Sequence, residues 1–176
     1  MAACGDDTPN KEIQQAQQAI DVARASEAER YATDEFTAAQ DALTRSRAAV
    51  VARDYRQALN DALDARDRAQ TASTSAVEKK AAAKTEVDRA LRDAALAIVD
   101  ARARLRTAET ARRPRAQLVA IRREITAAET RVQEARTLFE KGNYLDAGTL
   151  LTKTMVSLND RVGTLNGGTP PVLRRR

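Results

Sequence analysis

The chain of 176 residues has no histidine, no tryptophan and one cysteine, and only 6 glycines, 4 prolines, 3 tyrosines and 2 phenylalanines. Histidine is the commonest general base and the commonest metal ligand, so its absence removes the usual basis for both. A single cysteine can form neither an intramolecular disulfide nor a multi-cysteine zinc site. We therefore expect no metal, no cofactor and no enzymatic activity.

Alanine and charged residues dominate what remains. Alanine occupies 37 positions, and 31% of the residues are charged. Alanine has the highest helix propensity, and its small side chain lets helix axes approach closely. We predict an all-α protein of elongated antiparallel helical hairpins with coiled-coil-like packing. Its core should be thin, which leaves no room for a deep enclosed pocket.

Apolar residues recur at spacings of three and four along most of the chain, which is the pattern of amphipathic helices. We predict one helical domain over 11–165, a tether over 1–10 and a disordered basic tail over 166–176. The expected helices cover 11–31, 33–53, 54–112, 115–141 and 143–165.

Two details of these helices follow from local signals. Thr33 or Asp34 is expected to cap the helix that begins there, by accepting free backbone N–H groups. The third helix changes its apolar register after a run of weak helix formers, and Ser75 and Glu78 have capping-box spacing. These signals predict a break near 72–76, with one continuous helix as the alternative.

An internal repeat relates residues 43–62 to residues 132–151, with a helix, a short turn and the start of the next helix in each copy. In each copy an aromatic residue follows a short turn, and an alanine follows three positions later. We expect the aromatic side chain to plug the turn and the alanine to admit the preceding helix at close range. These residues are Tyr55 and Ala58 in one copy and Tyr144 and Ala147 in the other.

The same turns carry a family resemblance. Residues 141–147 (KGNYLDA) resemble the inter-helix turn of a tetratricopeptide repeat, and residues 53–58 (RDYRQA) resemble it without the glycine. Residues 29–69 are similar to an uncharacterised family of alanine-rich helical hairpins on bacterial envelope lipoproteins. That family often has proline where Ala32 stands and leucine where Phe36 stands. The resemblance implies an envelope location and a scaffold-like helical module, and it brings no catalytic residues.

The first residues resemble the end of a bacterial lipoprotein signal, because two alanines precede Cys4. In that family the signal is cut before the cysteine, which then carries acyl chains, so the resemblance implies lipidation of Cys4. The basic and apolar stretches of a signal peptide are missing, so we expect a miscalled start codon or a trimmed signal. The alternative is a stray exposed cysteine. Gly5, where inner-membrane members have aspartate, favours the outer membrane.

Carboxylates are numerous, and five of them have an arginine four residues later, which stabilises exposed helices. These pairs are Asp41–Arg45, Asp64–Arg68, Asp88–Arg92, Asp100–Arg104 and Glu109–Arg113. No carboxylate lies on an apolar stripe that would raise its pKa; only Glu27 and Glu86 come near one. We interpret the carboxylates as solvated faces and not as acid–base catalysts.

Charge is distributed unevenly along the chain. Residues 1–88 carry a net charge of −4 and residues 89–176 carry +9. Eight arginines stand against one acidic residue, Glu109, between residues 102 and 123. They are Arg102, Arg104, Arg106, Arg112, Arg113, Arg115, Arg122 and Arg123. Pro114 ends a helix here, so a hairpin would gather these arginines at its tip.

Such a tip would attract an anionic partner. Lipid headgroups, lipopolysaccharide, an anionic wall polymer, nucleic acid and an acidic protein all qualify, and the alternative is a solvated loop that keeps the protein soluble. Nucleic acid is disfavoured, because no aromatic residue between 56 and 138 could stack on a base.

We predict a lipid-anchored protein of the bacterial cell envelope, in the outer membrane and facing the periplasm, that acts as a helical scaffold, spacer or protein-interaction module. The alternative is a cytoplasmic coiled-coil adaptor or a nonspecific binder of anionic polymers such as nucleic acid. Self-association is left open, since Leu43 and Val50 could pack within one chain or between two.

Overall fold

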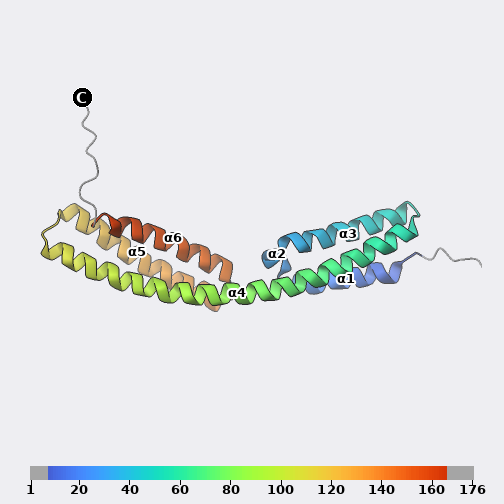
Figure 1. Cartoon of the computed structure of the whole chain (residues 1–176), viewed down its shortest axis with the longest axis horizontal. Coiled ribbons are helices and arrows are strands. Elements are labelled where there is room, and N and C mark those ends of the chain that lie inside the picture. Colours follow the sequence, from blue (N-terminus) through green and yellow to red (C-terminus); the bar gives the residue numbers. More distant parts are fainter. Residues whose placement is uncertain (1–7, 166–176) are drawn as a thin grey trace, which may run out of the picture. The chain divides into compact units, whose positions relative to one another are not determined.

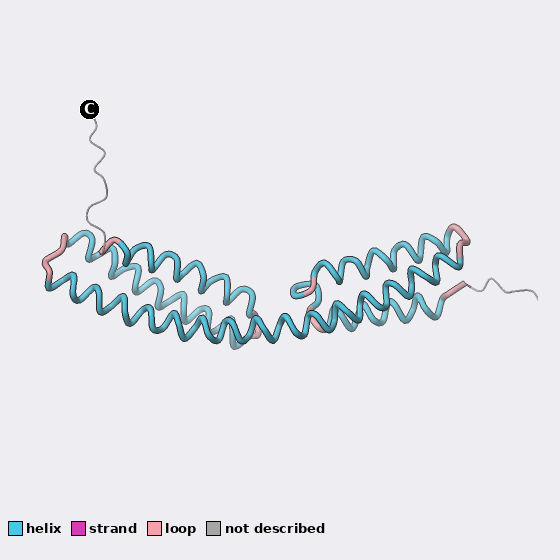
Figure 2. The backbone as a smooth tube through the Cα atoms, in the orientation of Figure 1, coloured by secondary structure: helices cyan, strands magenta, loops and turns pink. Residues whose placement is uncertain are grey.

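The computed structural model describes residues 8–165, and all regular structure in this range is α-helical (Figures 1 and 2). The helices are α1 (Asn10–Ala25), α2 (Ala28–Tyr31), α3 (Thr33–Val51), α4 (Tyr55–Thr110), α5 (Arg115–Glu140) and α6 (Tyr144–Gly163). The prediction of an all-α protein is confirmed. Most of the predicted tether and the whole predicted tail, 166–176, lie outside the described residues.

The chain divides into two compact units, residues 1–82 (unit 1) and residues 83–176 (unit 2). Unit 1 contains α1, α2, α3 and the first part of α4, and unit 2 contains the rest of α4 with α5 and α6. This corrects the single helical domain predicted over 11–165. The reason is that no residue between Ala76 and Val87 is buried, so neither core continues through this stretch of α4.

In unit 1, α3 and the first part of α4 run antiparallel. Ser46 Oγ donates a hydrogen bond to the Ala58 carbonyl at 2.7 Å, close to the turn that joins the two helices. Lys79 Nζ pairs with Glu35 at 3.2 Å, close to their other ends. α1 packs against α3, so the unit is a bundle of three long helices and the short α2 (Figure 2).

The core of unit 1 is built largely from alanine. Six alanines on α4 are fully buried at alternating spacings of four and three. They are Ala58, Ala62, Ala65, Ala69, Ala72 and Ala76. Larger buried side chains include Ile20, Phe36 and Leu43 from α1 and α3. Burying a leucine or isoleucine side chain contributes about 1.5–3 kcal/mol, whereas burying the methyl-sized side chain of alanine contributes about 0.8 kcal/mol. The core of unit 1 therefore gains little from the apolar area that each side chain buries and depends on close packing of the helices.

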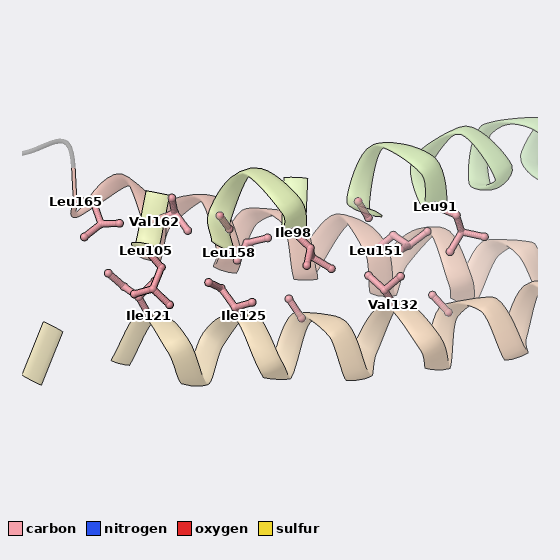
Figure 3. Packing of buried hydrophobic residues seen from close by; sticks show 14 of the residues in the cluster. Leu91, Ile98, Leu105, Ile121, Ile125, Val132, Leu151, Leu158, Val162 and Leu165 are labelled. Atoms are coloured by element: carbon pink, nitrogen blue, oxygen red, sulfur yellow. The ribbon is translucent and has the colours of Figure 1, made fainter. Parts of the chain in front are cut away.

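Unit 2 has a core of larger aliphatic side chains, which α4, α5 and α6 all contribute (Figure 3). The buried leucines and isoleucines include Leu91, Ile98 and Leu105 from α4, Ile121 and Ile125 from α5, and Leu151 and Leu158 from α6. The thin alanine core predicted for the whole chain therefore describes unit 1 and is wrong for unit 2.

The two units repeat the same buried positions at an offset of 89 residues. Phe36 and Leu43 on α3 correspond to Ile125 and Val132 on α5, and all four are buried. On the helices that follow, the buried positions also correspond, as in Ala58 and Ala147, Ala62 and Leu151, and Ala69 and Leu158. The repeat predicted over 43–62 and 132–151 thus lies on the helix pairs α3–α4 and α5–α6, and the buried positions extend it to Phe36 and Ile125 on one side and to Ala69 and Leu158 on the other.

One type of turn ends α3, α4 and α5. The second residue after each helix has a left-handed backbone, at Arg53 (φ 58°), Arg112 (φ 53°) and Gly142 (φ 80°). The next residue's N–H then bonds to the carbonyl five positions back, as from Asn143 to Leu138 at 2.9 Å. This is the Schellman motif, which usually carries glycine at the left-handed position.

The helix predicted over 11–31 is interrupted in the structure. α1 ends at Ala25, Glu27 has a left-handed backbone (φ 60°), and α2 begins at Ala28. The Ser26 hydroxyl donates to the Val22 carbonyl at 3.1 Å, and the Glu27 carboxylate pairs with Lys80 on α4. These interactions stabilise a bend that the apolar spacing does not reveal.

Two predicted caps are wrong. Thr33 does not cap α3, because its hydroxyl donates to the Glu29 carbonyl at 2.9 Å, and Asp34 makes no capping hydrogen bond. The break near 72–76 and its capping box are absent, because α4 continues through these residues. The Thr71 hydroxyl donates to the Asp67 carbonyl at 3.0 Å, so its hydrogen bond is made within the helix and does not interrupt it.

Candidate anionic-partner surface

The eight arginines predicted to attract an anion lie where α4 ends and α5 begins, within unit 2 (Figure 1). α4 stops because Arg112 adopts a left-handed backbone, and Pro114 then precedes the first residue of α5. We call these arginines the arginine surface. Its members are Arg102, Arg104, Arg106, Arg112, Arg113, Arg115, Arg122 and Arg123, and all are exposed.

Four members of the arginine surface are engaged by neighbouring groups. The ion pairs are Arg102–Glu129 at 2.6 Å, Arg104–Asp100 at 2.7 Å and Arg122–Glu109. Arg113 Nη2 donates to the Leu165 carbonyl at 3.2 Å, which links the turn between α4 and α5 to the residues that follow α6. The carboxylates nearest the arginine surface are therefore occupied.

The other four arginines have no ion pair or hydrogen bond with any described residue. They are Arg106, Arg112, Arg115 and Arg123, which we call the four free arginines. Because Glu109 is the one acidic residue between 102 and 123 and pairs with Arg122, it does not neutralise them. The surface thus keeps uncompensated positive charge that the fold does not need.

Apolar atoms lie beside these cations. Val119, Arg122, Arg123, Thr126 and Ala127 line an open hollow of 460 Å³ on α5. The Val119 side chain is 45% exposed there, whereas Ile121, two residues later, is buried. The hollow therefore combines two guanidinium groups with a small apolar floor.

The predicted helix-face ion pairs form in part. Asp64–Arg68 at 2.8 Å, Asp88–Arg92 and Asp100–Arg104 at 2.7 Å are confirmed. Arg45 pairs instead with Asp61 and Asp64, each at 3.3 Å, and Glu109 pairs across to α5. In these two cases a partner on the next helix replaces the partner expected on the same helix.

Asp61 corrects the expectation that no carboxylate lies on an apolar stripe. It is 7% exposed and stands beside the alanine seam of α4. Gln57 Nε2 donates to its carboxylate at 2.9 Å, and Arg45 Nε pairs with it at 3.3 Å. These partners satisfy the buried charge, so Asp61 joins α3 to α4 structurally.

Glu124 is a second carboxylate with structural partners that the sequence analysis missed. Its Oε1 accepts hydrogen bonds from Ser157 Oγ at 2.7 Å and from Arg131 Nη1 at 3.0 Å. The Ser157 hydrogen bond lowers the pKa of Glu124 below its ordinary value of 4.5, and Arg131 lowers it further, while desolvation opposes both. This carboxylate therefore stays charged and links α5 to α6.

The predicted turn residues lie at the starts of α4 and α6. Ala58 and Ala147 are fully buried, and Tyr55 and Tyr144 are partly buried. The Tyr144 ring packs on Phe139 with centroids 5.3 Å apart. Beside it, an open groove of 460 Å³ runs between α4 and α6, where Gly148 approaches the Val87 side chain.

Cys4, the predicted lipidation site, lies outside the described residues. Among the helices of residues 8–165, none combines the length and apolar character that crossing a membrane requires. The same residues hold no group of three or more potential metal ligands. No protein-family model, curated protein or solved structure matches the chain.

Proposed function

We propose that the chain is a non-enzymatic lipoprotein of the bacterial cell envelope, which acts as a helical scaffold and interaction module. The observation that carries this proposal is the set of four free arginines at one end of unit 2. Clustered like charges repel one another, so they favour binding of an anionic partner that neutralises them. Packed helices on either side hold the arginine surface in place.

Attachment to the membrane rests on Cys4, which follows Ala2 and Ala3 as in lipoprotein signals. Gly5 favours the outer membrane, with the helical units on the periplasmic side. A polar segment that includes Asp6 and Asp7 would separate the lipid from α1. Acyl chains hold a protein at a bilayer without a spanning helix.

The partly buried carboxylates suit a structural role better than a catalytic one. Asp61 and Glu124 are held by partners, and a catalytic carboxylate needs a pKa close to the working pH. The lowered pKa of Glu124, caused first by Ser157, moves away from that range. These carboxylates hold helices together.

The anchor is tested by labelling cells that express the complete natural gene with a palmitate analogue. The wild-type protein should incorporate the label, Cys4→Ser should not, and Asp6→Asn should label like wild type. Protein that stays unlabelled although a known lipoprotein in the same cells is labelled would contradict lipidation.

A cytoplasmic adaptor or nonspecific binder of anionic polymers is the second candidate, and the sequence pI of about 9.7 favours it. The genomic sequence upstream of Met1 discriminates between the two. An in-frame apolar stretch there indicates a lipoprotein, whereas a ribosome-binding site directly before Met1 without such a stretch indicates a cytoplasmic protein.

A further inference from the structure

We infer that the arginine surface docks onto an anionic phospholipid surface, which gives the protein a membrane contact besides Cys4. This inference rests on the proposed function and names the partner of its interaction surface. The partner class is a bilayer rich in phosphate headgroups, and the contact does not require acylation.

The placement of the four free arginines carries the first step. The Arg122–Glu109 ion pair joins α5 to α4. Arg106 lies one turn before Glu109, and Arg123 follows Arg122, so both lie within a turn of this link. Arg112 and Arg115 belong to the connection itself. All four are therefore gathered at one end of unit 2.

Guanidinium chemistry carries the second step. Each guanidinium presents a planar fork of N–H donors that matches the oxygens of a phosphate. A bilayer offers many phosphates in one plane, so several arginines can bind at the same time. Near an anionic membrane each basic side chain strengthens binding by about fivefold.

Val119 and the hollow beside it favour a lipid surface over nucleic acid. Val119 is 45% exposed and lines the hollow with Arg122 and Arg123. An exposed apolar side chain among cations suits the boundary between headgroups and acyl chains. Stacking on the bases of single-stranded nucleic acid would need aromatic side chains, and residues 56–138 contain none, which leaves only nonspecific phosphate contacts for nucleic acid.

The test measures binding of the full chain carrying Cys4→Ser to vesicles by sedimentation. Vesicles of phosphatidylcholine with phosphatidylglycerol should bind it, and pure phosphatidylcholine vesicles should not. Replacing all four free arginines by glutamine should weaken binding by roughly 600-fold, because four losses of about fivefold multiply. The substitutions are Arg106→Gln, Arg112→Gln, Arg115→Gln and Arg123→Gln.

A matched control removes the same charge elsewhere. It replaces Arg53, Arg56, Arg136 and Lys141, which are exposed cations, by glutamine. Arg53 shares the left-handed backbone of Arg112, so both variants change one residue of this kind. Circular dichroism checks that both stay helical. The control should bind vesicles far more tightly than the surface variant, and equal losses in both would overturn the inference.

A second arm separates lipid from nucleic acid. Val119→Ser should weaken vesicle binding by about fivefold, because an apolar contact is lost, and should leave binding to a labelled DNA duplex unchanged. Tighter binding to DNA than to anionic vesicles at the same salt concentration would overturn the inference. The Cys4→Ser protein used for these measurements carries no acyl chain. Failure of the lipid inference would therefore be independent of the outcome of the Cys4 labelling experiment.

Discussion

Single residues in the turns have distinct backbone requirements. Gly142 has φ 80°, and a side chain there would have open space around it, so backbone strain alone opposes substitution. Gly142→Ala should therefore lower the free energy of unfolding by about 1 kcal/mol.

Gly163, at the end of α6, is the matched control. It also has open space but no left-handed backbone, so Gly163→Ala should be neutral or stabilise by up to about 1 kcal/mol. Urea unfolding of both variants measures the difference. Equal effects of the two substitutions would show that φ does not govern the turn.

The ion pair and hydrogen bond at Glu124 predict a pH dependence. Its folded pKa lies below the ordinary 4.5, with the Ser157 hydrogen bond as the main cause, so its stabilising contribution is present above about pH 4.5. That contribution is lost as the pH falls through the folded pKa. Glu124→Gln should thus destabilise by roughly 1 kcal/mol at neutral pH and progressively less in acid.

Urea unfolding at several pH values tests this dependence. Glu134→Gln, at an exposed position of α5 without a hydrogen-bond or ion-pair partner among the described residues, should have little effect throughout. A cost of Glu124→Gln that stayed the same from neutral to acidic pH would contradict the role assigned to the charged form.

At the scale of elements, the alanine seam of α4 sets how closely the helices of unit 1 approach. Ala69 is fully buried, whereas the corresponding position in unit 2 is Leu158. Ala69→Leu should overpack unit 1 and cost about 1–3 kcal/mol. Ala48→Leu, on an exposed position of α3, should stay within about 0.5 kcal/mol of wild type in thermal unfolding. A neutral Ala69→Leu would mean that the seam is not tightly packed.

The elements were largely predictable from apolar spacing, because Ile121, Ile125 and Val132 recur along one face of α5 and are buried there. The bend at Glu27 could not be predicted in this way, because it depends on an ion pair between the Glu27 carboxylate and Lys80, which is distant in sequence. The sequence also allows either a break near 72–76 or one continuous helix, because the outcome depends on packing between helices. Threonine disfavours a helix in isolation, and burial of neighbouring alanines outweighs that preference.

The partners of the arginine surface were likewise only partly predictable from the sequence. Its position followed from Pro114 and the arginine count, but which members are free depends on how α4 aligns with α5 and α6. Glu109 was expected to pair with Arg113, yet it pairs with Arg122, and Arg113 bonds to the Leu165 carbonyl. Partners on neighbouring helices cannot be deduced from a spacing of four along one helix.

For the whole molecule, the different cores of the two units predict different local stability. Unit 2 buries leucine and isoleucine where unit 1 buries mostly alanine. Backbone amides of α5 and α6 should therefore exchange with deuterium more slowly than those of α1 and α3. Mass spectrometry of peptides from the exchanged protein measures this order. Faster exchange in α5 and α6 would contradict the ranking of the cores.

Two membrane contacts, the lipid on Cys4 and the arginine surface, are the central claim. Fractionation of cells that express the natural gene tests both through the share of protein that sediments with membranes before and after a high-salt wash. Wild type should stay bound through the wash, and Cys4→Ser should bind but be released by salt. Cys4→Ser combined with glutamine at Arg106, Arg112, Arg115 and Arg123 should not bind. Wild-type protein in the soluble fraction would contradict the account.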